Sequence, residues 1–242
     1  MGKTALSICL AFLLSGAVPA FSQSIQSTVK DVLGPAAGGS GGMQGDVVSG
    51  LKEALAVGTG TTVQTLSKAN GYFGDAAVRI LMPEKLRAAA EVLKKAGYQK
   101  EVDEFVLSMN RAAEQAAPKA RPIFEEAVKK MTIEDAKGIL NGGNTAATDY
   151  FKAKTSPQLT EAFTPVIAES MDQAGTTRSY KALTDRYRKL VPFGGLDAFD
   201  LDSYVTRKSL DGLFFKVGQE EAKIRTNPAA RTTDLLKKVF AK

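Results

Sequence analysis

The chemistry open to this chain rests on carboxylates, Lys, Arg, Tyr and Ser, because its 242 residues include no His and only one Cys. Without His, Ser-His-Asp and Cys-His catalysis are excluded, as is a zinc site built on imidazole. One Cys cannot form an intrachain disulfide. We therefore predict no metal site and no cofactor, we assign no catalytic residue, and we favour a non-enzymatic protein.

The densest group of charged residues lies in the C-terminal segment. Glu221 and Arg225 are four residues apart, in the orientation that favours an ion pair within a helix. Arg231 falls in the first turn of a helix predicted to begin at Asn227-Pro228, where a cation opposes the helix dipole. We expect Arg231 to pair with Glu220 or Glu221 or with a bound anion, and we favour the structural pairing.

A second candidate site is the turn at residues 140–151, where Gly142 and Gly143 separate two predicted helices. A helix that begins at Asn144 or Thr145 presents free backbone N–H groups, which can hold an anion. The alternative, which we favour, is a tight turn without a ligand. The combined candidate binding or structural cluster comprises Asn144, Asp149, Tyr150, Asp211, Glu220, Glu221, Arg225, Asn227 and Arg231.

Two acidic patterns favour a structural role over chemistry. Asp197, Asp200 and Asp202 lie in a Gly-rich turn without the calcium-binding EF-hand pattern, so we predict that an Asp caps the following helix. Adjacent acidic pairs with the residue types of a glycosidase occur at 103–104, 125–126 and 220–221. Neighbours in a helix point about 100° apart, so none is a facing pair by itself. A carboxylate-dependent hydrolase is therefore our third-ranked function.

Residues 1–20 have the pattern of a secretory signal peptide. Lys3 supplies the positive start, an apolar run extends from Ala5 to Val18, and cleavage is expected after Ala20 or Ser22. The run is too short to span a membrane. The alternative to a signal peptide is a buried N-terminal helix. Cleavage would remove Cys9, which leaves a mature chain without Cys. We predict a periplasmic protein, with secretion as an alternative.

The mature chain divides into a short N-terminal segment and one domain. Residues 21–45 combine an amphipathic stretch, Ser24 to Leu33, with a Gly-rich linker. That stretch could dock on the domain or bind a partner or membrane, but we favour a weakly ordered tail. Residues 46–242 form the predicted domain.

Helical periodicity dominates that domain. Apolar residues recur at helical spacing in five stretches: 86–93, 98–113, 120–131, 159–171 and 180–191. Thr132 with Asp135 resembles a capping box, Ser156-Pro157 a helix start, and Pro165 a kink or break near Thr164. C-terminal caps are expected at Gly97, Gly142 and Gly175.

Only residues 77–82 look extended, ending before Pro83. The pattern predicts an all-α fold: a single compact multi-helix domain of about ten short helices without a substantial sheet.

One predicted helix concentrates positive charge, although the whole chain carries only +6. Its cations are Arg178, Lys181, Arg186, Arg188 and Lys189. Because the chain is predicted to be exported, an anionic lipid headgroup or acidic polymer is a better partner than nucleic acid. Solvated surface charge is the simpler explanation, and we favour it.

Three segments of the chain resemble one bacterial family. They are residues 50–55 (GLKEAL), the turn at 140–151, and a C-terminal stretch that runs from LDGLF at 210–214 through IRTNPAAR at 224–231 to Val239-Phe240. Together they are similar to domain-of-unknown-function family 4197, over nearly all of the mature chain. The resemblance implies an exported helical protein, typical of Gram-negative bacteria. It implies no activity and no catalytic residue.

The leading functional prediction is a soluble exported protein that binds a small molecule or an envelope protein. The alternative is an envelope-associated protein that contacts anionic lipid or polymer through its basic helices, without a transmembrane span after signal cleavage. We predict no nucleic-acid partner.

Overall fold

The computed structural model describes residues 43–191 and 199–226, and within these ranges it contains α-helices and no β-strand. This confirms the predicted all-α fold. The helices are α2 Met43–Leu66, α3 Glu84–Leu93, α4 Gln99–Ala116, α5 Ala120–Lys130, α6 Ile133–Asn141, α7 Ala146–Gln173, α8 Thr176–Leu190 and α9 Leu201–Thr226. A π-helical turn, Lys94–Tyr98, joins α3 to α4, and a 3-10 turn, Ala117–Lys119, joins α4 to α5. The predicted signal peptide, Asp197, Asn227 and Arg231 lie outside the described residues.

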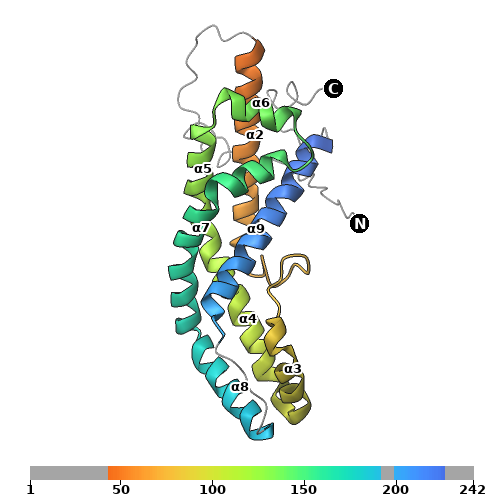
Figure 1. The fold of residues 1–242 in the computed structure, drawn as a ribbon, viewed down its shortest axis with the longest axis vertical. Helices are drawn as coiled ribbons and strands as arrows, with labels where there is room; N and C mark the ends of the chain where they lie inside the picture. Colours follow the sequence, from red (N-terminus) through yellow and green to blue (C-terminus); the bar gives the residue numbers. More distant parts are fainter. Residues whose placement is uncertain (1–42, 192–198, 227–242) are drawn as a thin grey trace, which may run out of the picture.

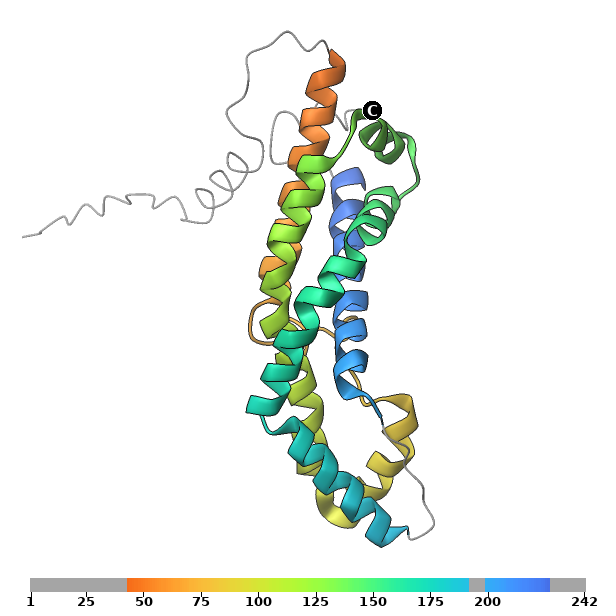
Figure 2. The same ribbon diagram turned by 60° about the vertical axis from the view of Figure 1, so that its left-hand side comes forward.

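The helices form an elongated bundle (Figure 1). α5, α6 and the beginning of α2 lie at one end, and α3 and α8 lie at the other, in both views (Figures 1 and 2). α9 runs through the middle and packs against both α2 and α7, while α4 packs against α7 and α8. Segments far apart in the sequence therefore share one core.

The described residues contain fewer and longer α-helices than the about ten short ones predicted. α2, α7 and α9 contain 24, 28 and 26 residues. Pro157 and Pro165 were expected to begin a helix and to interrupt one, yet both lie inside α7. An internal Pro costs about 3 kcal/mol. Buried residues on both sides of these prolines keep α7 continuous, because its packed face extends across them: Phe151, Leu159, Phe163 and Ile167.

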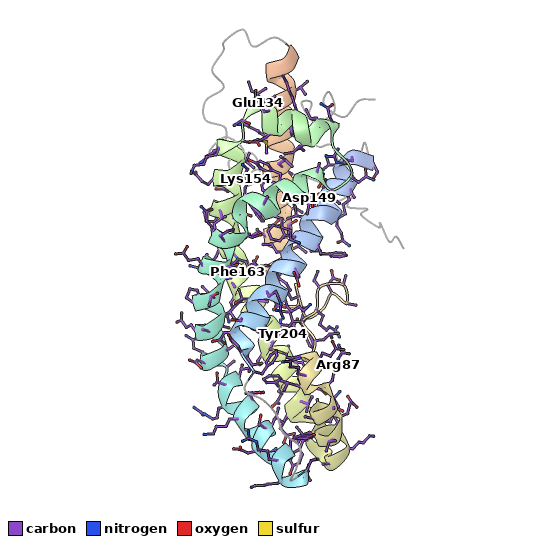
Figure 3. The ribbon with its side chains drawn as sticks, viewed as in Figure 1. Arg87, Glu134, Asp149, Lys154, Phe163 and Tyr204 are labelled. Carbon is purple, nitrogen blue, oxygen red and sulfur yellow. The ribbon has the colours of Figure 1, made fainter. Side chains whose placement is uncertain are left out.

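α7 nevertheless changes direction along its length. Its first part crosses the molecule and its second part runs along it (Figure 1). In Figure 3, Asp149 and Lys154 lie on the first part, and Phe163 lies beside the second. Pro157 falls between Lys154 and Phe163, and sharp bends in helices are usually found at Pro. The bend turns the start of α7 toward α9.

The apolar stripes predicted from the sequence form the core. Phe105, Phe124, Phe151 and Phe163 are at most 1% exposed, and the rings of Phe124 and Phe151 meet edge to face at 5.2 Å. Leu190, at the end of the fifth stripe, is an exception with 47% of its surface exposed.

Several predicted helix ends are confirmed. Thr132 and Asp135 form a reciprocal capping box at the start of α6, with both hydrogen bonds at 3.0 Å. Gly97 and Gly175 adopt the left-handed conformation, with φ of 93° and 68°, which favours glycine. Gly142 follows α6 as expected, but its backbone is extended.

The stretch predicted to be extended is an irregular segment without a strand. Its backbone is held by a side chain, since the amide of Asn110 on α4 accepts from the Ile80 N–H and donates to the Ile80 carbonyl, both at 2.8 Å. Asn110 is completely buried. The Asn110 side chain thus makes the two backbone hydrogen bonds that a neighbouring strand would make in a sheet.

Candidate functional site

The predicted anion site at the α6–α7 turn is filled by a carboxylate from the protein itself. Glu221 of α9 accepts the backbone N–H groups of Ala147 and Thr148 at 3.0 and 2.9 Å, and the Thr148 hydroxyl at 2.7 Å. Glu221 is only 6% exposed. A negative charge is favourable at a helix N-terminus, so Glu221 caps α7 and occupies the place of an external anion.

Arg225 completes this arrangement and confirms the predicted ion pair. Its Nε and Nη2 donate to Glu221 Oε1 at 3.0 and 2.8 Å, and Nη2 also donates to the Ile139 carbonyl at 2.9 Å. Ile139 lies in the last turn of α6, where a cation is favourable. The pair therefore joins the end of α6 and the start of α7 to α9, and its role is structural.

The other described residues of the predicted cluster have separate local roles. Asp149 accepts from the Thr145 hydroxyl at 3.0 Å, and Glu220 pairs with Lys223 at 2.7 Å. The Tyr150 hydroxyl donates to the Ala127 carbonyl at 3.2 Å, and burial raises the pKa of Tyr150. Asn144 is exposed in the turn. Asp211 pairs with Lys208 at 3.5 Å and lines a different feature, a groove between α7 and α9.

Asp200 confirms the capping prediction for the acidic turn. Its carboxylate accepts the Ser203 N–H at 3.0 Å and the Ser203 hydroxyl at 2.6 Å, at the start of α9. These bonds lower the pKa of Asp200, the Ser203 hydroxyl most of all. Among the described residues, no group of three or more acidic side chains is placed to hold a metal ion.

The α7–α9 groove is the site that sequence reasoning missed. It has a volume of about 260 Å³ and lies between one face of each helix. It is lined by Lys152, Ser156, Thr160 and Thr164 of α7 and by Ser203, Thr206, Arg207, Leu210, Asp211 and Phe214 of α9. The α7 residues recur every four positions, so they lie on one face of a continuous helix. This spacing is visible in the sequence, but the helix start expected at Pro157 placed Lys152 and Thr160 in different helices.

The hydroxyls of the groove present hydrogen-bond acceptors to any ligand. The hydroxyls of Ser156, Thr160 and Thr164 donate to carbonyls one turn earlier, at 2.6, 2.9 and 2.8 Å. Each oxygen keeps its lone pairs for an external donor. The Thr206 hydroxyl differs from these three. It has no hydrogen-bond partner among the described residues, and it is buried, since Thr206 is only 2% exposed.

The charged and apolar groups of the groove complement these hydroxyls. Lys152, Arg207 and Asp211 are exposed, whereas Leu210 and Phe214 are buried beside them. Two cations and one carboxylate provide donors and an acceptor on the rim, and the apolar side chains provide a surface for carbon atoms. This combination suits a small molecule with hydroxyl groups and a negative charge.

Two other cavities offer less to a ligand. One, between α3, α4 and α8, is lined mainly by apolar side chains and holds about 20 Å³, room for about one water molecule. The other, over the start of α4, is about 540 Å³, but its charged side chains engage their own helix. There, Gln99 donates to Asp103 at 2.7 Å and Lys100 pairs with Glu104 at 3.7 Å.

A buried carboxylate of α4 is also structural. Glu114 is 4% exposed and accepts the backbone N–H groups of Tyr72 and Phe73, both at 3.1 Å, while pairing with Arg111. The Tyr72 hydroxyl donates to the Ser209 carbonyl at 2.8 Å, and burial raises the pKa of Tyr72 far above its usual value. These contacts hold the irregular segment between α2 and α3 against α4 and α9.

The fold and these contacts define an all-α domain whose buried charges mainly cap helices and hold loops. A family model described as a protein of unknown function (DUF4197) matches residues 42–241, so the chain belongs to this family, as the sequence motifs indicated. No curated protein and no solved structure matches the chain. In residues 43–191 and 199–226, every helix is too short or too polar to cross a membrane.

Proposed function

We propose that this protein is exported and binds a small polar ligand in the α7–α9 groove. The observation that carries the binding proposal is the row of three α7 hydroxyls that lines the groove together with exposed charged side chains of both helices. A hydrogen bond between a ligand and one of these hydroxyls contributes about 0.5–1.5 kcal/mol.

The chemistry of the groove supports one class of ligand. Three hydroxyl oxygens accept hydrogen bonds, so the ligand brings donors such as hydroxyl groups. Lys152 and Arg207 favour an anionic group, and Asp211 accepts from further hydroxyls. A sugar acid combines these features, with its carbon ring against Leu210 and Phe214.

Binding is better supported than hydrolysis. The paired carboxylates considered from the sequence have partners on their own helices, for example Glu125 with Arg121 at 3.0 Å and Glu126 with Lys130 at 3.0 Å. The groove contains one carboxylate, Asp211, whereas acid–base hydrolysis of a glycoside uses two. The groove thus has the groups for recognition and lacks the second acid of a hydrolase.

The binding proposal can be tested with a matched pair of variants. Thr160→Val removes a groove hydroxyl and keeps the side-chain shape, and Thr226→Val removes an exposed hydroxyl on α9 outside the groove that makes the same kind of bond, to the carbonyl one turn earlier. Calorimetric titration of the full-length protein would use glucuronate, glucose and inorganic phosphate. We expect glucuronate to bind most tightly of the three compounds. Its affinity should fall about tenfold in Thr160→Val and stay unchanged in Thr226→Val.

Two results would contradict the binding proposal. Equal affinity of glucuronate for the wild type and Thr160→Val would exclude the groove as the site. Absence of binding by all three compounds would exclude the ligand class.

Export has its own test. Cell fractionation and N-terminal sequencing should find a periplasmic chain that begins at Phe21 or Gln23. An uncleaved chain in the cytoplasm would refute export.

A further inference from the structure

α8 concentrates net positive charge on one short helix. Its 15 residues include five cations and one carboxylate, Asp185, a net charge of +4. The whole chain of 242 residues carries +6. Such a concentration of one sign attracts an oppositely charged surface more effectively than the same charge spread over the molecule.

The other described helices neutralise many of their cations locally. Arg87 pairs with Glu84 on α3, Lys130 with Glu126 on α5, and Lys208 with Asp211 on α9. On α8 the corresponding pair is Arg188 with Asp185, at 3.8 Å. The positive field of α8 is therefore less compensated than that of its neighbours.

Contacts with α4 and with the π-helical turn before it show which cation of α8 faces the body of the protein. Arg186 pairs with Glu101 at 2.9 Å and lies over the Tyr98 ring at 4.4 Å. Arg178, Lys181 and Lys189 are exposed and have no ion-pair partner among the described residues. We call these three residues the α8 basic face.

The α8 basic face points away from the core, and Asp185, which pairs with Arg188, lies between Lys181 and Lys189 on it. Its three residues lie within about 80° on the helical wheel and span about 16 Å along the axis. Leu183 and Thr176 are buried on the opposite side of α8. The helix itself lies at one end of the elongated molecule, so a large flat surface can reach it (Figures 1 and 2).

We propose that the α8 basic face docks the protein on an anionic lipid bilayer. Mobile headgroups can gather under three cations on a convex helix, and each cation near such a surface contributes about 1 kcal/mol. Nucleic acid suits this face less well, because the tyrosines of α8 are half-buried and leave no exposed ring for base stacking. The proposal goes beyond ligand binding and shares no residue with the α7–α9 groove.

The test uses the mature protein, purified after signal cleavage, and vesicles of defined composition. Flotation would compare phosphatidylcholine vesicles with vesicles that also contain phosphatidylglycerol. We expect binding only to the anionic vesicles, and loss of binding as salt rises from about 0.1 M to about 1 M, because the Debye length falls from about 10 Å to about 3 Å.

Two triple variants distinguish binding through the α8 basic face from binding through the net charge of the protein. Arg178→Gln, Lys181→Gln and Lys189→Gln together should weaken partitioning about a hundredfold. The control removes the same charge from exposed lysines elsewhere, by Lys68→Gln, Lys119→Gln and Lys137→Gln, and should retain most of the binding. Circular dichroism checks that both variants fold.

Three outcomes would overturn the proposal. The first is equal binding to neutral and anionic vesicles, and the second is an equal loss in both triple variants. The third is binding to heparin without binding to anionic vesicles, which would assign the α8 basic face to an acidic polymer.

Discussion

The Glu221 carboxylate binds both the backbone N–H and the hydroxyl of Thr148, at 2.9 and 2.7 Å, although the two residues are 73 positions apart. This contact gives the first turn of α7 its cap from α9. Arg225 extends it to the Ile139 carbonyl of α6. Three helices meet at one buried ion pair, so a change there acts on all of them.

Removal of the buried carboxylate should destabilise the fold. Glu221→Ala leaves the donors of Thr148 and Ala147 without their acceptor, and loss of one partner from a buried ion pair costs about 3–5 kcal/mol. Urea unfolding should show this loss. Glu220→Ala, which removes the neighbouring Lys223 pair, should cost at most about 1 kcal/mol, and equal effects would refute the structural role of Glu221.

Gly212 is required by a close approach to Tyr72. A Cβ at position 212 would lie 2.9 Å from the Tyr72 ring and 3.2 Å from the Val78 side chain. Tyr72 is fully buried and anchored at Ser209, so the ring cannot move away easily. Gly212→Ala should cost about 1–3 kcal/mol in urea unfolding, despite the better helix propensity of Ala.

The matched control for this prediction is Gly218→Ala, further along α9. A Cβ there meets Thr148 at an ordinary 3.5 Å. This variant should be neutral or stabilised by up to about 1 kcal/mol. If both variants behaved alike, the close approach at Tyr72 would not be the cause.

The amide of Asn110 should be essential to the irregular segment. Asn110→Leu keeps the side-chain size but leaves the buried N–H and carbonyl of Ile80 unpaired, which costs about 2–4 kcal/mol. Hydrogen exchange should show that the Ile80 amide loses more protection than the drop in global stability explains. The protection of amides in α5 should fall only by that drop. Unchanged exchange at Ile80 would contradict this role.

The ion pair between Asp75 and Lys216 predicts a dependence of stability on acid pH. Lys216 Nζ lies 2.8 Å from Asp75 Oδ2, and the hydrogen bond from Lys216 is the main cause that lowers the pKa of Asp75. Because the folded pKa is depressed, the stabilisation is present above about pH 4 and is lost as pH falls through the folded pKa.

Asp75→Asn should therefore flatten the loss of stability in acid. Urea unfolding at several pH values would compare the variant with the wild type and with Asp149→Asn, whose carboxylate accepts from the nearby Thr145 hydroxyl. Identical acid slopes for Asp75→Asn and the wild type would show that this pair does not contribute.

The features that sequence reasoning predicted correctly depend on residues within about four positions of one another. Helical periodicity identified buried positions such as Phe105 and Phe163. Spacing alone predicted the capping box of Thr132 and Asp135 and the ion pair of Glu221 and Arg225. These are interactions within one helix turn, so the local sequence contains both partners.

Tertiary structure alone decided the features that join distant segments. Packing across Pro157 kept α7 continuous, where the local rule predicted a helix start. α9 supplied the carboxylate that caps the N-terminus of α7, and it also forms one wall of the groove. α4 supplied the side-chain amide that holds Ile80. The free energies of such contacts depend on which helices become neighbours, and no local pattern in the sequence contains that information.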